Sequence, residues 1–397
     1  MTDLELDPQP AADLEPQSAA ALDPSLAAEL DAEVAADPIP ATEPDDTPPG
    51  DTPQGAPEVL VPDAGAAAAT IDMRARRRRL VLLAVLFGAA IALLLFSAWY
   101  LVTRKPISEL PLPGLTVENV PTYAFSVYGV TRPTGVAVSP DGERIYVTQT
   151  EDDPTVVVFD GKGNRLTTLE PPPNSGSDHV PVYVAINPLS GDLYVSDRPA
   201  ASVYVYSRDG IYQRTFEPPV GLRGWQPLGL AFSATGELFV TDVSGPYNRV
   251  HEFAPDGTLV RSIGEPEQFS FPNGIAVDAA GNLYVADSNN GRLVVFDPDG
   301  RQRAVVRRGP GVGDLGMPRG TTIDDLGRVY VVDTSGQVVK VYHALSVADD
   351  PPAYIGQFGT EGSDDGAFRY PNGVAADGRA RIYVADWDNN RVQVWTY

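Results

Sequence analysis

Short apolar runs separated by turn residues form the basic pattern of this chain. Residues 271–300, FPNGIAVDAAGNLYVADSNNGRLVVFDPDG, contain three such runs, each closed by Gly, Asn or Asp. Runs of β-branched and aromatic residues between turn residues predict an antiparallel meander rather than a helix. A single meander cannot bury both of its faces, so we expect the chain to repeat it.

The meander recurs six times. Each copy opens with a proline, and the successive gaps are 48, 46, 45, 46 and 53 residues; the prolines are Pro133, Pro181, Pro227, Pro272, Pro318 and Pro371. This period lies in the range of four-stranded propeller blades. The pattern therefore predicts an all-β, six-bladed β-propeller over residues 115–397.

Two further positions recur in the copies. The residue two after the proline is glycine in five copies and Tyr183 in the second. The second strand ends in aspartate in five copies, with Gln149 in the first; the aspartates are Asp197, Asp242, Asp287, Asp333 and Asp386. We interpret these aspartates as structural, either capping a turn or pairing with Arg249, Arg292 or Arg391, because aspartate in loops commonly accepts local backbone hydrogen bonds.

The two ends of the repeat array are irregular in a complementary way. The sixth copy stops at Tyr397 after its third strand, whereas residues 123–129, YAFSVYG, precede the first copy and resemble the fourth strands at 259–264 and 354–359. A ring has no free sheet edge when the N-terminal strand completes the last blade. We therefore expect residues 123–129 to pair beside residues 391–395.

The motifs PNGIAVD, LYVAD and NNGRLVVFD, with the similar segment 370–395, resemble the NHL repeat family. The resemblance covers about residues 116–397 and implies a six-bladed propeller. Propellers of this family serve as protein-binding modules, RNA-binding modules, outer sensor domains of bacterial membrane proteins, and lyases. The fold alone therefore does not select a function.

The segment before the repeats has a different composition. Residues 1–72 contain 17 acidic residues and no Lys or Arg, and they have almost no aromatic or β-branched side chains. Such a segment cannot offset the entropy of ordering, so residues 1–73 are predicted to form a disordered, Ala/Pro-rich acidic tail. A docking segment for a basic partner is the alternative interpretation.

A transmembrane helix is predicted at residues 80–102. These 23 residues carry no charge and contain only Ser97 as a clearly polar side chain, and Trp99 and Tyr100 lie at one end. At about 1.5 Å per residue the segment is long enough for a hydrocarbon core of about 30 Å. A cleaved signal peptide would be shorter and closer to the N-terminus.

The flanking charges predict the orientation of this span. An arginine-rich topology signal at 74–79 precedes it, whereas only Arg104 and Lys105 follow; the arginines are Arg74, Arg76, Arg77, Arg78 and Arg79. The arginine-rich side is expected in the cytoplasm, near anionic lipid. The protein is then a single-pass cell-membrane protein with a cytoplasmic N-terminus, a Pro-containing linker at 103–114 and an extracytoplasmic propeller.

The composition suggests a bacterium. The chain has no cysteine, so no disulfide supports the propeller.

Enzymatic chemistry finds little support in the repeats. The amidating-lyase relatives place zinc-binding histidines just after the opening proline, but here those positions hold Thr134, Val182, Leu228, Asn273, Arg319 and Asn372. The three histidines, at 179, 251 and 343, are not expected to converge as a zinc site requires. A gluconolactonase-like Ca²⁺ site would find Asn273 and Asn372 suitably placed, but no carboxylate accompanies them and Arg319 would repel a cation. A metal-dependent hydrolase or lyase remains the alternative hypothesis; no cofactor is expected.

Binding is the favoured function. The formal net charge of −24 disfavours nucleic acid as a partner, since phosphate binding needs a basic surface. The long connections lie on one rim of the propeller, and they carry arginines and aromatic residues of the types enriched at binding hot spots. The candidate ligand-binding residues at this rim and the channel mouth are Arg223, Trp225, Tyr247, Asn273, Arg319, Arg369, Tyr370, Asn372 and Trp387. Trp225 and Trp387 have the alternative role of packing loops over the blades. The expected ligand is a protein, a peptide or a cell-wall glycan.

Overall fold

The computed structural model describes residues 120–397 apart from 171, 174–178, 219, 223, 246, 247 and 346–350, together with residues 80–88, 90, 91, 93, 94 and 97. The described residues between 80 and 97 are helical. Within the described part of the chain, no helix has the length and hydropathy needed to cross a bilayer. The predicted span at 80–102 is therefore not confirmed and stays a prediction. The tail at 1–73, the arginine cluster at 74–79 and the linker at 103–114 lie outside the described residues.

Six four-stranded antiparallel sheets form the six blades. Blades one to three comprise β2 (Pro133–Val138), β3 (Arg144–Gln149), β4 (Thr155–Asp160) and β5 (Arg165–Thr168); β6 (Pro181–Ile186), β7 (Leu193–Asp197), β8 (Ser202–Tyr206) and β9 (Tyr212–Phe216); and β10 (Pro227–Phe232), β11 (Leu238–Asp242), β12 (Arg249–Phe253) and β13 (Leu259–Ile263). Blades four to six comprise β14 (Pro272–Val277), β15 (Leu283–Asp287), β16 (Arg292–Phe296) and β17 (Gln302–Val306); β18 (Pro318–Ile323), β19 (Arg328–Asp333), β20 (Val338–His343) and β21 (Tyr354–Phe358); and β24 (Pro371–Ala376), β25 (Arg381–Asp386), β26 (Arg391–Thr396) and β1 (Thr122–Tyr128). A short 3₁₀ turn, η3 (Val220–Leu222), lies before the third blade, and β22 (Thr360–Glu361) pairs in parallel with β23 (Ala367–Phe368) before the sixth.

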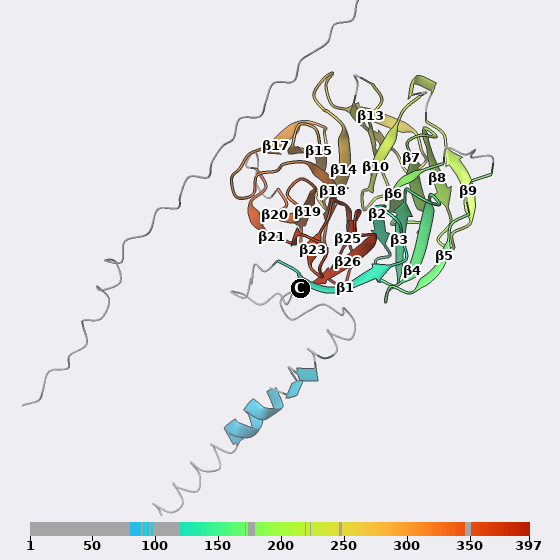
Figure 1. Cartoon of the computed structure of the whole chain (residues 1–397). Coiled ribbons are helices and arrows are strands. Elements are labelled where there is room, and N and C mark those ends of the chain that lie inside the picture. Colours follow the sequence, from blue (N-terminus) through green and yellow to red (C-terminus); the bar gives the residue numbers. More distant parts are fainter. Residues whose placement is uncertain are drawn as a thin grey trace, which may run out of the picture. The chain divides into compact units, whose positions relative to one another are not determined.

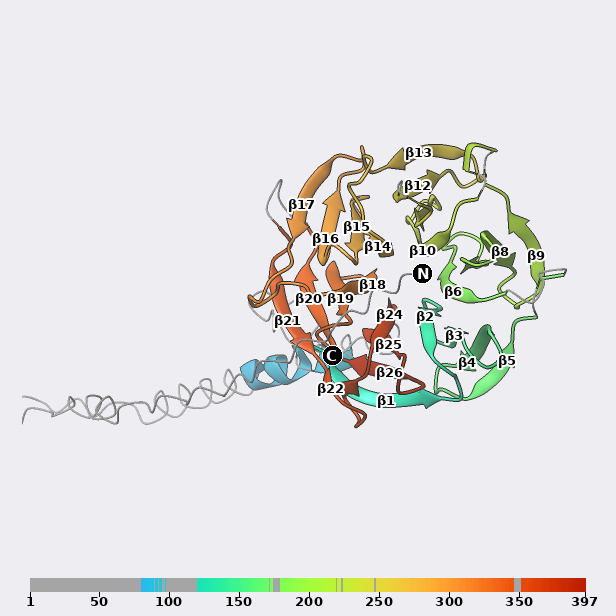
Figure 2. The same ribbon diagram turned by 45° about the horizontal axis from the view of Figure 1, so that its top comes forward.

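The blades stand around a central axis, with the proline-initiated strand of each blade innermost (Figures 1 and 2). The apolar core is divided into layers that lie between neighbouring sheets. One such layer joins Tyr146 and Val158 of the first blade to Val195 and Tyr204 of the second. Because each sheet is covered on both faces by its neighbours, the second and third strands are buried almost throughout.

The innermost strands approach one another too closely for side chains at the recurrent glycine. A Cβ atom built at Gly274 would lie 2.3 Å from the Arg319 carbonyl oxygen, and one at Gly229 would lie 2.1 Å from that of Asn273. Such separations are far inside van der Waals contact, so the glycine is required by close approach of two backbones. This explains the recurrence of glycine two residues after the opening proline.

The predicted closure of the ring is confirmed. Strand β1 pairs antiparallel with β26, from Thr122 opposite Thr396 to Tyr128 opposite Arg391. Tyr123 packs edge-on against Trp395, with ring centroids 6.0 Å apart. Strands from the two ends of the array thus complete the sixth blade, and Figure 2 shows them side by side.

Deleting residues 115–129 from the full chain should lower the melting temperature of the propeller or make the protein insoluble. The deletion removes β1 and exposes the backbone edge of β26, which is an aggregation-prone edge. Differential scanning calorimetry and sedimentation of the expressed protein measure the two effects. Deleting residues 107–113 is the matched control, and equal melting of both truncations and the parent would refute a stabilising role for closure.

Candidate functional site

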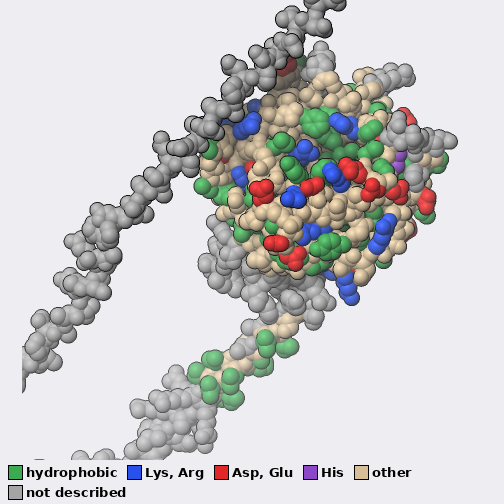
Figure 3. Space-filling model, viewed as in Figure 1, with side chains coloured by type: hydrophobic (Ala, Val, Ile, Leu, Met, Phe, Trp, Pro, Cys, Tyr) green, Lys and Arg blue, Asp and Glu red, His purple; other side chains and the backbone are tan. Residues whose placement is uncertain are grey.

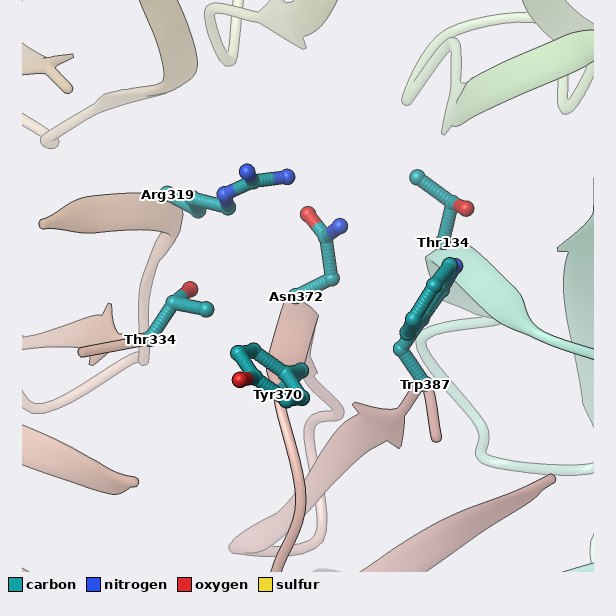
Figure 4. A pocket seen from close by; sticks show the side chains of 6 residues that line it. All are labelled: Thr134, Arg319, Thr334, Tyr370, Asn372 and Trp387. Carbon is teal, nitrogen blue, oxygen red and sulfur yellow. The ribbon is translucent and has the colours of Figure 1, made fainter. Parts of the chain in front are cut away.

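A pocket of about 420 Å³ opens where the innermost strands begin, and we call it the mouth pocket. Its walls come from the first, fifth and sixth blades and combine one cation with neutral polar and aromatic groups: Thr134, Arg319, Thr334, Tyr370, Asn372 and Trp387 (Figure 4). Four of the nine predicted site residues are thereby brought together. Arg319 and Asn372 follow the opening prolines of β18 and β24, and Tyr370 and Trp387 lie in flanking loops.

Arg319 is the only cation lining the mouth pocket. Its guanidinium points into the space between Asn372 and Thr134 (Figure 4). The Nε atom is buried and has no hydrogen-bond partner, and Nη2 lies 3.9 Å from the sulfur of Met317. A buried donor without a partner costs about 1–3 kcal/mol, so a hydrogen-bond acceptor that enters the pocket would stabilise Arg319.

Two aromatic rings border the other side of the pocket. Trp387 and Tyr370 meet edge to face, with ring centroids 6.4 Å apart, and Tyr370 is 56% exposed. The guanidinium of Arg132 lies 4.0 Å from the Trp387 ring centroid, and its Nε pairs with Glu151 at 3.0 Å. Trp387 is therefore held in place by a cation–π contact while its other surface lines the pocket.

A second pocket of about 240 Å³ adjoins the first, and we call it the axial pocket. It shares Thr134, Arg319 and Asn372 with the mouth pocket, which makes the two continuous at the axis. Its further lining is mostly apolar: Thr150, Val180, Val182, Tyr183, Arg198, Pro199, Leu228, Phe271 and Asn273. No carboxylate or histidine is among the described residues that line the two pockets.

Tyr183 forms the floor of the axial pocket. Its side chain starts from the second blade and crosses to the fourth and sixth, where the hydroxyl lies 2.7 Å from Asn273 Oδ1 and 3.3 Å from Asn372 Oδ1. A phenol has one proton, so both bonds coexist when it donates to Asn273 and the Asn372 amide is turned to donate its NH₂. Burial raises the pKa of Tyr183 although the charge of Arg319 opposes it, so the hydroxyl stays neutral.

Three residues at the mouth have a left-handed backbone conformation that bulky side chains rarely adopt. They precede the opening prolines of the first, fourth and sixth blades: Arg132 has φ of 46°, Phe271 of 59° and Tyr370 of 51°. Each side chain borders a pocket or contacts its wall. Such strain costs on the order of 1–3 kcal/mol per residue and concentrates at ligand-binding sites.

The recurrent aspartates anchor the loops that lead into the innermost strands. Each accepts a hydrogen bond from a backbone N–H one or two residues before the opening proline, as Asp386 does from Arg369 at 2.7 Å. The other donors are Val180, Gln226, Ser270 and Met317, to Asp197, Asp242, Asp287 and Asp333 respectively. Asp287 and Asp386 also pair with Arg292 and Arg391, at 2.7 and 2.8 Å. The structural interpretation of these aspartates is confirmed, although it is His251 that bonds to Asp242.

Asp333 shows how this anchor works beside Arg319. Its carboxylate accepts the N–H groups of Gly316 and Met317, each at 3.0 Å, and pairs with Lys340 at 3.3 Å. Burial alone would raise the pKa of Asp333, but the two N–H groups and the ammonium outweigh it and hold the pKa below its ordinary value of 3.8. The charged form of Asp333 therefore fixes the segment that enters Pro318 and Arg319.

The remaining predicted site residues have different outcomes. The prediction of Trp225 as a ligand-binding residue is corrected. Trp225 is 1% exposed, packs between blades two and three, and donates a hydrogen bond from Nε1 to the Ala201 carbonyl at 2.9 Å. It therefore has the alternative role of packing. Asn273 lies at the channel floor with Tyr183. Arg369 is exposed and lies 3.9 Å from Asp388. Arg223 and Tyr247 lie outside the described residues.

Sequence reasoning missed several pocket residues. Thr134 and Thr334 were not selected because hydroxyl residues are common in strands and their turns. Tyr183 was visible as the one break in the glycine series, but that signal does not show where the ring points. Phe271 and Arg198 enter the axial pocket through loop geometry that no motif marks.

The histidines do not form a common site. His179 lies 2.5 Å from Asp197 in the second blade, and His251 bonds to Asp242 and Ser262 in the third. His343 ends β20 in the fifth blade. Within the described part of the chain, no three side chains of the His, Cys, Asp and Glu types come together as metal ligands would.

The repeat signature is recognised in two blades. The NHL repeat profile matches residues 269–296 and 368–395, which correspond to the first three strands of the fourth and sixth blades. The chain carries NHL repeats.

Curated relatives extend this match. NHL repeat-containing protein 3 from Mus musculus is 31% identical over 179 residues, covering 40% of this chain and 50% of the relative. The protein brain tumor from Drosophila melanogaster is 29% identical over 132 residues, covering 32% of this chain and 12% of that protein. The chain thus spans about half the length of the first relative and a small part of the second.

A solved structure supports the architecture. A streptogramin B lyase superposes with a TM-score of 0.51 at 16% sequence identity, covering 70% of this chain and 98% of the lyase chain. Similarity at this level shows the shared propeller fold and carries no information about activity. The NHL propeller is therefore established by the repeats and the fold together.

Replacing Asp333 with Asn should cost about 1–3 kcal/mol of unfolding free energy at pH 7, because an amide cannot accept both N–H groups and pair with Lys340. The folded-state pKa of Asp333 is lowered, so its contribution is present above about 3.8 and lost as the pH falls towards the folded-state value. The stability difference between parent and variant should therefore shrink below about pH 4. Urea unfolding over a pH series measures it, with the exposed Asp299→Asn as control; a difference that does not vary with pH would refute the anchor.

Proposed function

We propose that this protein is a binding propeller, tethered to a membrane, whose mouth pocket receives a peptide segment of another protein. The observation that carries the proposal is the mouth pocket itself, a space of about 420 Å³ lined by two aromatic rings and by Arg319, whose buried Nε has no hydrogen-bond partner. Trp, Tyr and Arg are the side chains that contribute most to binding at protein interfaces. The site is also concave and held on rigid strands, which is typical of ligand pockets.

A binding role is favoured over catalysis by the chemistry of the lining. Both pockets contain hydroxyl, amide, aromatic and guanidinium groups, and they offer no general base or nucleophile–base pair. NHL repeat-containing protein 3 is named for its repeats, and the fold neighbour named a lyase shares only the architecture. These points support a module that holds a partner.

The charge distribution favours a protein or peptide over nucleic acid. On the face drawn in Figure 3, Lys and Arg side chains are interspersed with Asp and Glu, without a continuous basic surface. The chain has 53 acidic and 29 basic residues. A phosphate backbone would meet mostly repulsive charge on such a protein.

Membrane tethering is supported by the apolar helical residues before the propeller. Ten large apolar side chains between Leu80 and Leu94 are 42–70% exposed. An uncovered apolar helix surface of this kind is stabilised by lipid. Together with the arginines at 74–79, it supports a single-pass protein with a cytoplasmic N-terminus and an extracytoplasmic propeller.

A photoreactive p-benzoylphenylalanine at position 370 of the full chain should crosslink to a partner protein in the native cells. Tyr370 is exposed beside the mouth pocket, so a bound peptide would lie within reach of the ketone. Mass spectrometry of the crosslinked product identifies the partner. The crosslink should disappear when Trp387 is also changed to Ala, since that removes one wall of the pocket.

The matched control places the same photoreactive residue at position 211, an exposed site in the β8–β9 turn at the opposite rim. Crosslinking from 211 with none from 370 would move the binding surface to that rim and contradict the proposal. A crosslink from 370 that persists in the Trp387→Ala protein would show that the pocket is not required.

Protease added to intact spheroplasts should leave the acidic tail intact while the propeller is digested or released as a compact core. The arginines before the span keep the N-terminus inside, so only residues after about 103 are exposed to the protease. Antibodies against tags at the two termini measure the result. Loss of the N-terminal tag with protection of the C-terminal tag would reverse the topology.

A further inference from the structure

We propose that the mouth and axial pockets bind the free C-terminus of a peptide, with the terminal carboxylate on Arg319. This inference rests on the proposed function and names the chemical group that the site recognises. It follows from three features of the two pockets: an arginine whose buried Nε has no hydrogen-bond partner, an apolar compartment beside it, and a closed floor.

The arginine defines the charge of the ligand. Arg319 lines both pockets, its buried Nε has no hydrogen-bond partner, and no described carboxylate pairs with it. The chain as a whole has a formal charge of −24, yet no acidic residue is among the described residues that line the two pockets. A guanidinium binds a carboxylate through two parallel N–H···O bonds, which would satisfy the orphaned donor. The guanidinium is directed toward the neutral side chains of Asn372 and Thr134 (Figure 4).

The apolar compartment defines what must stand next to the carboxylate. The axial pocket begins at Arg319, and Val182, Leu228 and Phe271 form apolar parts of its wall. Arg198 also lines it, with its guanidinium 5.7 Å from the Phe271 ring centroid. In a peptide C-terminus the carboxylate and the last side chain are attached to the same Cα atom. One group can therefore contact Arg319 while the other enters the apolar compartment. The carboxylate of Asp or Glu within a chain carries no such neighbouring apolar group.

The floor defines how a chain can enter. Tyr183 crosses the axis and bonds to Asn273, and its ring is buried. A polypeptide therefore cannot pass through the channel and must enter it by an end. The residues before the terminus would then leave through the mouth pocket, alongside Tyr370 and Trp387.

The experiment uses the full chain, in detergent, labelled with 5-fluorotryptophan and observed by ¹⁹F NMR. The sequence has four tryptophans, and the resonance of Trp387 is assigned with Trp387→Phe. Acetyl-Ala-Leu with a free carboxylate should shift the Trp387 resonance saturably. Acetyl-Ala-Leu-amide should bind at least about tenfold more weakly, because it lacks the charge, and acetyl-Ala-Gly should bind more weakly than acetyl-Ala-Leu because it leaves the apolar compartment empty.

Three variants separate the carboxylate contact from general effects. Arg319→Gln should bind acetyl-Ala-Leu and its amide equally, whereas Arg319→Lys should keep a preference for the acid at reduced affinity, since an ammonium lacks the planar fork. Arg301→Gln makes the same chemical change at an exposed site in the β16–β17 turn and should behave like the parent. Circular dichroism confirms that each variant is folded.

Equal binding of the acid and the amide by the parent, or an unchanged preference in Arg319→Gln, overturns the inference. Tighter binding of inorganic phosphate than of acetyl-Ala-Leu overturns it in favour of phosphorylated ligands, and equal binding of acetyl-Glu-amide overturns it in favour of acidic side chains. The proposed function has its own test: if the crosslink from position 370 persists in Arg319→Gln and is lost in Trp387→Ala, the pocket binds a partner without using a terminal carboxylate.

Discussion

The lack of space at the propeller axis is the constraint on which the rest of the structure depends. Six innermost strands converge until a Cβ at Gly274 or Gly320 would lie within 2.4 Å of the next strand's backbone. Hydroxyl groups of the second strands and the loops after them bridge the same junctions: Thr241 donates to the Asn273 carbonyl at 2.9 Å, and Thr334 to that of Pro371 at 2.7 Å. These bonds satisfy carbonyl groups that would otherwise be buried without a partner. The junction between the sixth and first blades differs, because Trp387 occupies the position of Thr334, and the mouth pocket opens there.

Crowding at the axis also explains how the site is formed from ordinary repeats. The position after each opening proline lies close to the axis, and its six side chains differ from blade to blade. Two of them are asparagines that hold Tyr183, and one is Arg319. The recurrent aspartates supply the second requirement, because they fix the loop before each proline to its own blade. A rigid ring with anchored loops keeps the pocket formed in the absence of a ligand, which lowers the entropy cost of binding.

The sequence predicted those features that depend on repetition. The six blades, the closing strand and the aspartate anchors all follow from comparing equivalent positions, and each repeat tests the interpretation of the others. Whether a single aromatic residue is buried in the core or lies at the surface could not be derived in this way. Trp225 and Trp387 have the same chemistry and both lie near the rim, yet Trp225 is enclosed by Phe216 and Phe253, whereas Trp387 is held at the surface by Arg132. The difference arises from contacts between loops of different length, for which no repeat provides a template.

Tyr183 stands where the other five blades have glycine, at a position with little room for a side chain. A tyrosine at position 183 is compatible with the crowded axis only because its ring leaves the sheet and crosses to the opposite blades, where two asparagines provide partners for its hydroxyl. The side chain closes the channel between the mouth and axial pockets and the pocket formed by the other ends of the innermost strands. Arg319 lies above this floor, and its buried Nε has no hydrogen-bond partner. An acceptor that enters the pocket would satisfy this donor, and for this reason the proposed ligand is one that carries a carboxylate.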